Sequence, residues 1–505
     1  MRRVIATVLT IVMAIIPLSV WAEPMDFVGG VHNEYEYSEV VFLTGKPVKF
    51  VGEYKITVKE KEDEKTVKYD FRLTPEDTDI DGRLTRRVTL LTKYNRRNDK
   101  GQTIADTEID GNYSETITIE DERFVLEDFQ FSKSDVIDNR PASDFYSGNL
   151  KGRKYYKYSI RGDEKGKVIL DISGGDVGYK NFWGGTETQL INHTISFSGI
   201  LEDDDGDEDE EEWQGTVSIQ TSDSTTKTLK YSDNEANFSS FDGGHLRITN
   251  RQIVSRYNYN LPEWRNGLPR SRDREKDTID LSTSMNEKVE RLIVPKFKDV
   301  AGHWAEDYIK KLYSLDVFEG SETFFAPDVP MTRLEFTKGI IRACDIRATL
   351  EEENNRRRPS SRSKKEPEVS YFNDVSVENK AYNDIKQAVD KGIIKGTRDN
   401  EFVPDGPLTK AQAITILIRA LGFETKAPTP GYNTSFDDDN EIPYWAKDAI
   451  YVAREIGLIN GDMNNRINPN KSMTRAEASA MLIRFLEFLQ RDLQKDYREN
   501  IVNFK

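Results

Sequence analysis

Three cations in the C-terminal third of the chain occupy positions suited to binding an anion. Arg333, Lys410 and Arg475 each follow a threonine and stand at the start of an apolar run that we expect to be helical. A positive charge beside the positive end of a helix dipole is unfavourable by about 0.3–1 kcal/mol. A carboxylate or phosphate bound to the free helix amides and the cation would offset this penalty. The alternative is a cation that is simply solvated at the surface.

The residues around these cations carry a signal for starting a helix. In a capping box, the threonine hydroxyl accepts a hydrogen bond from the N3 amide, and a Glu or Gln at N3 reaches back to the N-cap amide. The sequence has this spacing three times, at Thr332/Glu335, Thr409/Gln412 and Thr474/Glu477. We therefore predict that these six residues are structural helix caps.

The capped segments belong to a repeat that occurs three times between residues 297 and 490. Each copy opens with Phe-x-Asp, reaches a glycine after a helical stretch, and has a proline five residues before the threonine. Each apolar run then contains an Ile-Arg pair. The repeated residues include Asp299, Asp374 and Asp438, then Gly320, Gly396 and Gly461, and finally Arg342, Arg419 and Arg484. Such a fixed order indicates three copies of one structural unit.

This repeat resembles the S-layer homology (SLH) domains of bacterial cell-surface proteins. The resemblance covers about residues 290–490 and includes His303-Trp304-Ala305 and Tyr444-Trp445-Ala446. It implies an all-α prism of three repeats in a pseudo-threefold arrangement, which binds acidic, often pyruvylated, secondary cell-wall polysaccharide in grooves between repeats. The glycan-binding residues predicted on this basis are Arg333, Lys410, Arg475, Trp304, Trp445, Asp299, Asp374, Asp438, Gly320, Gly396 and Gly461.

The tryptophans and glycines of this set also have structural explanations. An indole beside a polar groove can stack on a sugar, but a half-buried core tryptophan is the alternative for Trp304 and Trp445. Gly320, Gly396 and Gly461 are expected to end the first helix of each repeat as C′ residues. The resemblance implies in addition that the loop after this glycine lines a groove.

Repeat 2 departs from the pattern at three positions. Lys380 stands where the other repeats have tryptophan, Lys410 replaces arginine, and Gln412 replaces glutamate. Lysine cannot form the bidentate fork of arginine, so we expect any groove that relies on repeat 2 to be the weakest. A charged insertion, 350–368, separates repeats 1 and 2, and we expect it to be a mobile, solvated loop, with contact between its basic half and acidic glycan as the alternative.

The N-terminus has the features of a secretory signal peptide. Met1-Arg2-Arg3 is cationic, residues 4–20 are apolar, and Ala22 fits a cleavage site before Glu23. We predict cleavage after residue 22, a secreted mature chain with no transmembrane segment, and a place at the cell surface or cell wall. The single cysteine, Cys344, excludes an internal disulfide.

Charge and composition exclude other classes of partner and cofactor. The net charge of −16 argues against nucleic acid, which requires a basic patch. Metal-ligand and nucleotide motifs are absent from the sequence, so we predict neither a cofactor nor a specific metal site. The acidic run from Asp203 to Glu212 is the one exception, where weak, diffuse cation binding is the alternative to a solvated loop.

The N-terminal half has a different periodicity. Residues 23–261 contain many short runs of alternating apolar and polar residues, which predict an all-β region of antiparallel strands, either sandwich-like or an open barrel, in one or two units. The glycine- and aromatic-rich stretch 174–185 predicts a tight turn over the sheet, with a binding loop as the alternative. Residues 262–290, polar and charged with two prolines, predict a flexible linker.

These boundaries give a multidomain chain. After the linker follow repeat 1 (291–349), the insertion, repeat 2 (369–426), repeat 3 (427–490) and a tail (491–505). We interpret the protein as a non-catalytic wall anchor that displays a β-rich domain, since the β half lacks a recognisable catalytic constellation. The alternatives are a surface enzyme with its chemistry in the β half and a subunit of a surface lattice.

Overall fold

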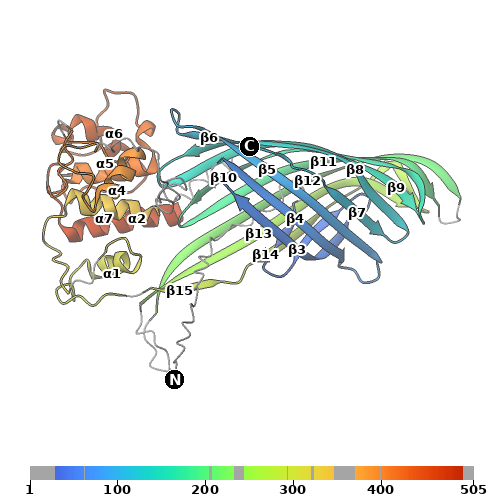
Figure 1. The fold of residues 1–505 in the computed structure, drawn as a ribbon, viewed down its shortest axis with the longest axis horizontal. Coiled ribbons are helices and arrows are strands. Elements are labelled where there is room, and N and C mark those ends of the chain that lie inside the picture. The colour runs from blue at the N-terminus through green and yellow to red at the C-terminus, as the bar shows by residue number, and fades with distance from the viewer. Residues whose placement is uncertain are drawn as a thin grey trace, which may run out of the picture.

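The structure is a computed structural model, and it describes residues 29–61, 63–203, 207–232, 244–292, 294–319, 323–345, 370–397 and 400–492. A long β region is followed by a cluster of helices at one end (Figure 1). The predicted signal peptide, the insertion 350–368, Gly320 and most of the tail lie outside the described residues.

The β region forms one antiparallel sheet of 15 strands. The strands are β1 Val31–His32, β2 Tyr37–Val41, β3 Val48–Glu60, β4 Glu64–Pro75, β5 Gly82–Arg97, β6 Gln102–Ile109, β7 Ser114–Ile119, β8 Glu122–Asn139, β9 Ser143–Ile160, β10 Asp163–Asn181, β11 Gly184–Glu202, β12 Glu208–Ser232, β13 Gly244–Arg265, β14 Leu268–Ser284 and β15 Lys288–Leu292. They are ordered almost as in the sequence, except that β7 pairs with β5 and β8, and β15 pairs with β13. The predicted antiparallel all-β region is confirmed.

Alternating side chains explain why these segments are strands. In β4, Val67, Tyr69, Phe71 and Leu73 are buried, whereas Lys68 and other intervening residues face solvent. Successive side chains of a strand point to opposite faces, so this alternation places one apolar face inside the curved sheet. Most of the buried apolar residues of β1 to β14 form one continuous core.

The sheet curves until its first and last strands meet. Asn33, after β1, donates from Nδ2 to Thr283 Oγ1 of β14 at 3.2 Å, and Tyr257 of β13 donates to the carbonyl of Gly29 at 2.7 Å. The ring of Phe42 contacts that of Tyr257 at 5.9 Å between centroids. One continuous sheet therefore replaces the separate sheets that a sandwich would have.

The predicted linker 262–290 is wrong over most of its length. Pro262 lies in β13, and β14 and β15 occupy most of the remaining residues. Residues 272–278 of β14 are exposed, so this part of the strand has no buried apolar face that would have indicated it in the sequence. A charged, exposed strand at a sheet edge is a common protection against edge pairing. The high charge that suggested a linker belongs to this edge strand.

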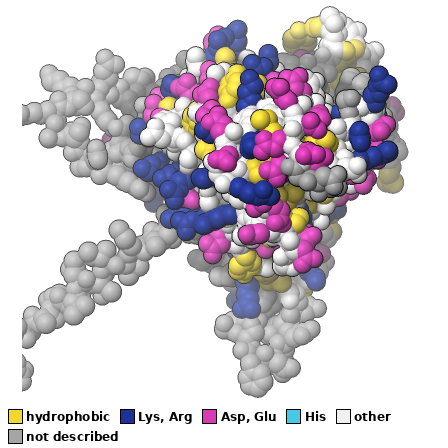
Figure 2. All heavy atoms as spheres, turned by 90° about the vertical axis from the view of Figure 1, so that its right-hand side faces the viewer, with side chains coloured by type: hydrophobic (Ala, Val, Ile, Leu, Met, Phe, Trp, Pro, Cys, Tyr) yellow, Lys and Arg dark blue, Asp and Glu magenta, His cyan; other side chains and the backbone are white. Residues whose placement is uncertain are grey.

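The end of the sheet far from the helices has a mixed charged surface. Figure 2 shows positive and negative side chains interspersed there, with hydrophobic side chains scattered among them. Arg161 is paired with Asp121 at 2.9 Å, and Lys165 with Glu208 at 2.6 Å. Exposed pairs of this kind contribute at most about 1 kcal/mol each, so this surface mainly favours solubility.

Six α-helices form the helical region among the described residues. Each repeat contributes two, which are α1 Glu306–Ser314 and α2 Arg333–Ala343, α4 Tyr382–Asp390 and α5 Lys410–Leu421, and α6 Tyr444–Glu455 and α7 Arg475–Glu487. The shorter turns are η1 Glu424–Lys426, η2 Asp439–Glu441 and η3 Phe488–Asp492. Within these ranges, no helix combines the length and the apolar character needed to cross a membrane.

The three repeats contact one another in a closed ring. The amide of Met331 donates to the carbonyl of Met473, that of Met473 to Leu408, and that of Leu408 to Met331, at 2.9, 2.9 and 2.8 Å. Helix packing follows the same ring, because α4 packs on α2, α6 on α5 and α1 on α7. Each repeat therefore completes its structure with elements of its neighbours, as expected for stacked repeats.

The two regions share a packed interface, which contradicts a flexible tether. Tyr179 and Trp183, at the turn between β10 and β11, are buried in the same apolar core as the helices. The amide of Ala142 donates to the carbonyl of Ala420 at 2.9 Å, and Asn181 Nδ2 to that of Leu489 at 3.2 Å. The stretch 174–185, predicted as a tight turn over the sheet, is instead the end of β10, a short turn and the start of β11, and this hairpin contacts the helices.

Candidate functional site

All three predicted capping boxes are present. The hydroxyls of Thr332, Thr409 and Thr474 accept from the N3 amides, and the N3 side chains accept in return from the N-cap amides. The threonine to N3 distances are 3.1, 3.3 and 3.1 Å. The six residues are structural helix caps, as the sequence predicted.

The helix amides beside the cations are not free, which corrects the simplest form of the anion-site hypothesis. The amide of Arg333 donates to the carbonyl of Gly406 at 3.0 Å, and that of Leu334 donates to Pro404 at 3.0 Å. The first two amides of α5 and of α7 are bonded in the same way to carbonyls of other repeats. These helix amides are therefore not available to an anion, and the cationic side chains remain the candidate contacts.

Arg333 is buried and fixed against repeat 2. Its Nε donates to the carbonyl of Phe402 at 2.8 Å, and its guanidinium lies 5.0 Å from the centre of the Phe402 ring. Burial lowers the pKa of Arg333 to about 10, and Asp374 acts in the opposite direction. Arg333 is only 5% exposed, so it is not a solvated surface cation.

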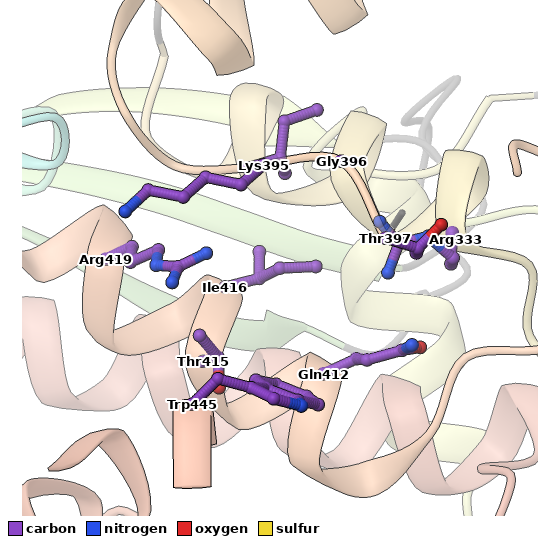
Figure 3. A pocket seen from close by; sticks show the side chains of 10 residues that line it. Arg333, Lys395, Gly396, Thr397, Gln412, Thr415, Ile416, Arg419 and Trp445 are labelled. Carbon is purple, nitrogen blue, oxygen red and sulfur yellow. The ribbon is translucent and has the colours of Figure 1, made fainter. Parts of the chain in front are cut away.

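A cavity of about 460 Å³ lies where the three repeats meet at α5. We call it the repeat-2 groove. Its lining includes Arg333 of repeat 1, Trp445 of repeat 3, and a larger contribution from repeat 2: Ile394, Lys395, Gly396, Thr397, Gln412, Thr415, Ile416 and Arg419. Figure 3 shows Lys395 and Arg419 on one side, Arg333 and Thr397 on the other, and Trp445 beside Gln412. Cations, amide and hydroxyl groups and an indole together suit an acidic sugar.

The corresponding cavity on α2 is much smaller, at about 130 Å³. We call it the repeat-1 groove. Its lining residues are Tyr313, Val317, Phe318, Glu319, Met331, Glu335, Lys338, Arg342 and Arg475. Arg475 forms an ion pair with Glu335, and Arg342 forms one with Glu319. Both arginines of this lining therefore have internal partners. The groove of repeat 2, which the sequence predicted to be the weakest, is the larger of the two.

The third cation, Lys410, is half-buried near repeat 3. Burial lowers its pKa, and the neighbouring carboxylate of Glu477 partly counteracts this. Glu477 itself is paired with Lys471 at 2.9 Å. Its glycan role stays a prediction.

The two tryptophans of the repeat are exposed rather than half-buried in the core. Trp304 is 60% exposed and Trp445 50%. Trp304 lies against the rings of His303 and Tyr308, and Trp445 lines the repeat-2 groove. Lys380, at the same place in repeat 2, is exposed. These positions are compatible with sugar stacking, which stays a prediction.

The three aspartates of Phe-x-Asp have structural partners. Asp299 accepts from the amides of Phe325 and Ala326 at 2.9 and 2.6 Å. Asp374 holds Phe402 and Val403 at the same two distances, as Asp438 holds Ile467 and Asn468. Each carboxylate thus fixes the loop before the repeated proline, which explains these residues without a ligand.

The repeated glycines do not end the first helices. The residues with left-handed backbone after α1, α4 and α6 are Asp316, Gly392 and Gly457, four residues earlier than predicted. Gly396 lines the repeat-2 groove, and a Cβ there would lie 3.1 Å from the carbonyl oxygen of Glu401. Gly461 is similarly close to the backbone of Asn465. These two glycines permit close approach of the following loop.

Sequence reasoning missed Arg419 and Lys395 as groove residues. Arg419 belongs to the repeated Ile-Arg pair, and this repetition was the available signal. Its Nε donates to Glu424 at 2.8 Å. Lys395 precedes the repeated glycine, where repeat 1 has Glu319, so no repeated residue type marked it.

Comparison with known proteins gives the helical region a family. A family model described as the S-layer homology domain matches residues 296–337, 372–414 and 435–479, once in each repeat. The chain carries three S-layer homology domains. The matched ranges include the three capping boxes and both Trp304 and Trp445, whereas the model matches none of the β region.

Proteins similar to this SLH chain are of several kinds. An amylopullulanase of Thermoanaerobacterium thermosulfurigenes is 32% identical over 193 residues, which are 38% of this chain and 9% of that protein. A surface-layer 125 kDa protein of Lysinibacillus sphaericus is 31% identical over 119 residues, 23% and 10% of the two chains. A cellulosome-anchoring protein of Acetivibrio thermocellus is 31% identical over 97 residues, 19% and 22%.

The shared part is therefore a small fraction of each relative. SLH domains joined to such different proteins are an anchoring module. The domains and the surface-layer relatives identify a secreted, cell-surface protein associated with the cell wall.

Among the described residues, no group of three or more histidine, cysteine or acidic side chains is placed to hold a metal ion. The acidic run is described only at Asp203 and from Asp207 onward, because residues 204–206 lie outside the described ranges. Weak cation binding there stays a prediction.

Proposed function

We propose that this protein anchors itself non-covalently to the cell wall by binding an acidic, pyruvylated secondary cell-wall polysaccharide through its SLH repeats. The repeat-2 groove is the observation that carries the proposal. It brings Arg333, Lys395 and Arg419 around one cavity with Trp445, and none of the lining residues that the structure describes is acidic. A sugar carboxylate would bind the cations, and the ring of the sugar would stack on the indole.

Focused positive charge is needed because the chain is acidic as a whole. A net charge of −16 repels an anionic polymer at long range. At ordinary ionic strength, exposed charges are screened beyond about 10 Å, whereas cations within a groove act at short range. We further propose that the ring of contacts among repeats is a pseudo-threefold prism, which holds the groove walls at fixed distances.

We propose that the β region has a display or spacing role and is not catalytic. The most deeply buried carboxylates in it are paired. Arg86 donates to both oxygens of Glu39 at 2.7 Å, and Glu115 accepts from Arg86, from Lys154 and from Tyr156. Burial alone would raise the pKa of Glu115, but Arg86 and Lys154 hold it well below its usual range. This cluster is suited to fixing the core, not to proton transfer.

Binding to cell-wall sacculi tests the anchoring proposal. The full chain without residues 1–22 should sediment with native sacculi, and mild acid hydrolysis of the pyruvyl ketals should release it. Acid-treated sacculi are the control, because they carry the same peptidoglycan without the ketals. Equal sedimentation with treated and untreated sacculi would contradict binding through the acidic substituents, and no sedimentation with either would contradict the anchor.

A further inference from the structure

Two of three equivalent groove positions differ in charge between the repeats. The residue before the repeated glycine is Glu319 in repeat 1, Lys395 in repeat 2 and Asn460 in repeat 3. The N3 residue of the capped helix is Glu335, Gln412 and Glu477 in the same order. In contrast, the arginine of the Ile-Arg pair is present in all three, as Arg342, Arg419 and Arg484. Repeat 2 therefore has neither of the acidic residues found in repeat 1.

In the repeat-1 groove, the two carboxylates meet the cations of the lining. Glu319 pairs with Arg342 and lies 3.9 Å from Lys338 Nζ, while Glu335 pairs with Arg475. Lys338 is also 3.6 Å from Asp384 of repeat 2. The lining thus contains three cations and two carboxylates. The cavity that remains, of about 130 Å³, has little unpaired charge to offer an anion.

In the repeat-2 groove, the same two positions hold Lys395 and Gln412. Within the described residues, the lining contains three cations and no carboxylate, and Glu424, which pairs with Arg419, lies outside it. Lys395 turns its amine toward the side of the cavity where Arg419 lies (Figure 3). The cavity of about 460 Å³ has room for a sugar residue and its acidic substituent.

We propose that Glu319 is a built-in carboxylate that closes the repeat-1 groove, and that Lys395 and Gln412 make the repeat-2 groove the anion-binding one. In this arrangement Glu319 occupies, beside Arg342, the place that a ligand carboxylate takes beside Lys395 and Arg419. Glu335 closes the other side by pairing with Arg475. The residues at two equivalent positions, 319/395 and 335/412, therefore decide which groove binds the anion. The inference rests on the proposed function.

The two grooves make opposite predictions for matched arginine variants. Arg419→Ala should weaken binding about tenfold or more, because it removes a charge-assisted contact to the ligand. Arg342→Ala, the equivalent change in the repeat-1 groove, should change affinity by less than about twofold, because its partner Glu319 lies within that lining, whereas Glu424, the partner of Arg419, lies outside the lining of the repeat-2 groove. Thermal unfolding of each variant shows whether it remains folded.

A charge swap should open the closed groove. The double variant Glu319→Lys/Glu335→Gln gives repeat 1 the residues of repeat 2 at both positions. Isothermal titration of the full mature chain with a methyl hexoside carrying a 4,6-linked pyruvyl ketal should then show one more bound ligand per chain than the wild type. The same hexoside without the ketal should bind neither protein, since only the ketal supplies the carboxylate.

The outcomes separate this inference from the anchoring proposal. Unchanged stoichiometry in a folded double variant, or equal losses from Arg419→Ala and Arg342→Ala, would overturn the assignment of the grooves while leaving the anchor intact. If the wild type does not bind the ketal probe but still sediments with sacculi, the inference and the acidic ligand both fall. If it binds neither the probe nor sacculi, the anchor falls with them.

Discussion

Arg333 of repeat 1 donates a 2.8 Å hydrogen bond from Nε to the carbonyl of Phe402 in repeat 2, and its guanidinium lies over the ring of the same phenylalanine. One side chain thus joins two repeats and forms part of the wall of the repeat-2 groove. The position that sequence reasoning assigned to ligand binding also has a structural role.

Replacing Arg333 should therefore reduce stability as well as binding. In Arg333→Met the aliphatic stem stays, but the carbonyl of Phe402 loses its buried donor. We expect the free energy of unfolding to fall by about 1–3 kcal/mol, measured by urea denaturation. Arg466→Met is the matched control, because Arg466 makes an exposed pair with Glu441 and its loss should amount to less than about 1 kcal/mol. Equal losses would contradict the buried role.

Val403 has a left-handed backbone with φ of 57°, which is unfavourable for a β-branched residue. Asn468 is the equivalent residue of repeat 3, and its φ is 52°. Because asparagine tolerates this conformation, Val403→Asn should raise the free energy of unfolding by about 1 kcal/mol, and Asn468→Val should lower it by a similar amount. Thermal unfolding of the two reciprocal variants checks the prediction, and shifts of the same sign would contradict it.

Asp299 should make stability depend on pH in acid. Its slight burial alone would raise the pKa, but hydrogen bonds from the amides of Phe325 and Ala326 lower it below the ordinary value. A depressed pKa in the folded state gives stability that is present above the unfolded value, near pH 4, and is lost as the pH falls through the folded value. The difference in melting temperature between wild type and Asp299→Asn should be larger at pH 7 than at pH 2. A constant difference would contradict the hydrogen-bonded role.

Trp183 should couple the sheet to the helices. It is 2% exposed and packs in the core of the helical region, although it belongs to the turn between β10 and β11. Trp183→Ala should lower the free energy of unfolding by about 3–5 kcal/mol and speed amide exchange in α5 and η3. Trp264→Ala, at the other side of the β region, should leave exchange in those helices unchanged. Unaltered amide exchange in Trp183→Ala would contradict this coupling and favour a flexible tether between the two regions.

Local patterns in the sequence were sufficient to predict part of this structure. The capping boxes depend on residues three apart, so Thr474 and Glu477 identify a helix start without knowledge of the rest of the fold. Strand positions were found where buried residues alternate, as in β4. The strands were nevertheless expected to be shorter, since the long ends of β12 and β13 are partly exposed and lose the alternation.

Features set by distant contacts could not be read from the sequence. The amides of Arg333 and Leu334 are bonded to carbonyls about 70 residues away, at Gly406 and Pro404, and a carbonyl leaves no sequence signal. Ion pairs in the lining of the repeat-1 groove, such as Arg475 with Glu335, depend on how the repeats assemble. The sequence shows that repeat 2 has Gln412 where the other repeats have glutamate. Its effect on ligand binding depends on the ion pairs that glutamate would form with neighbouring repeats, and these follow only from the assembled structure.

Retention of the full mature chain on native sacculi, compared between wild type and the Arg333→Ala/Arg419→Ala double variant, tests the central claim most directly. Sedimentation across a range of protein concentrations gives an affinity for each, and circular dichroism confirms that the variant is folded. The account predicts tight retention of the wild type and a loss of about a hundredfold in the variant, from two charge-assisted contacts. Equal retention of the two folded proteins would contradict it.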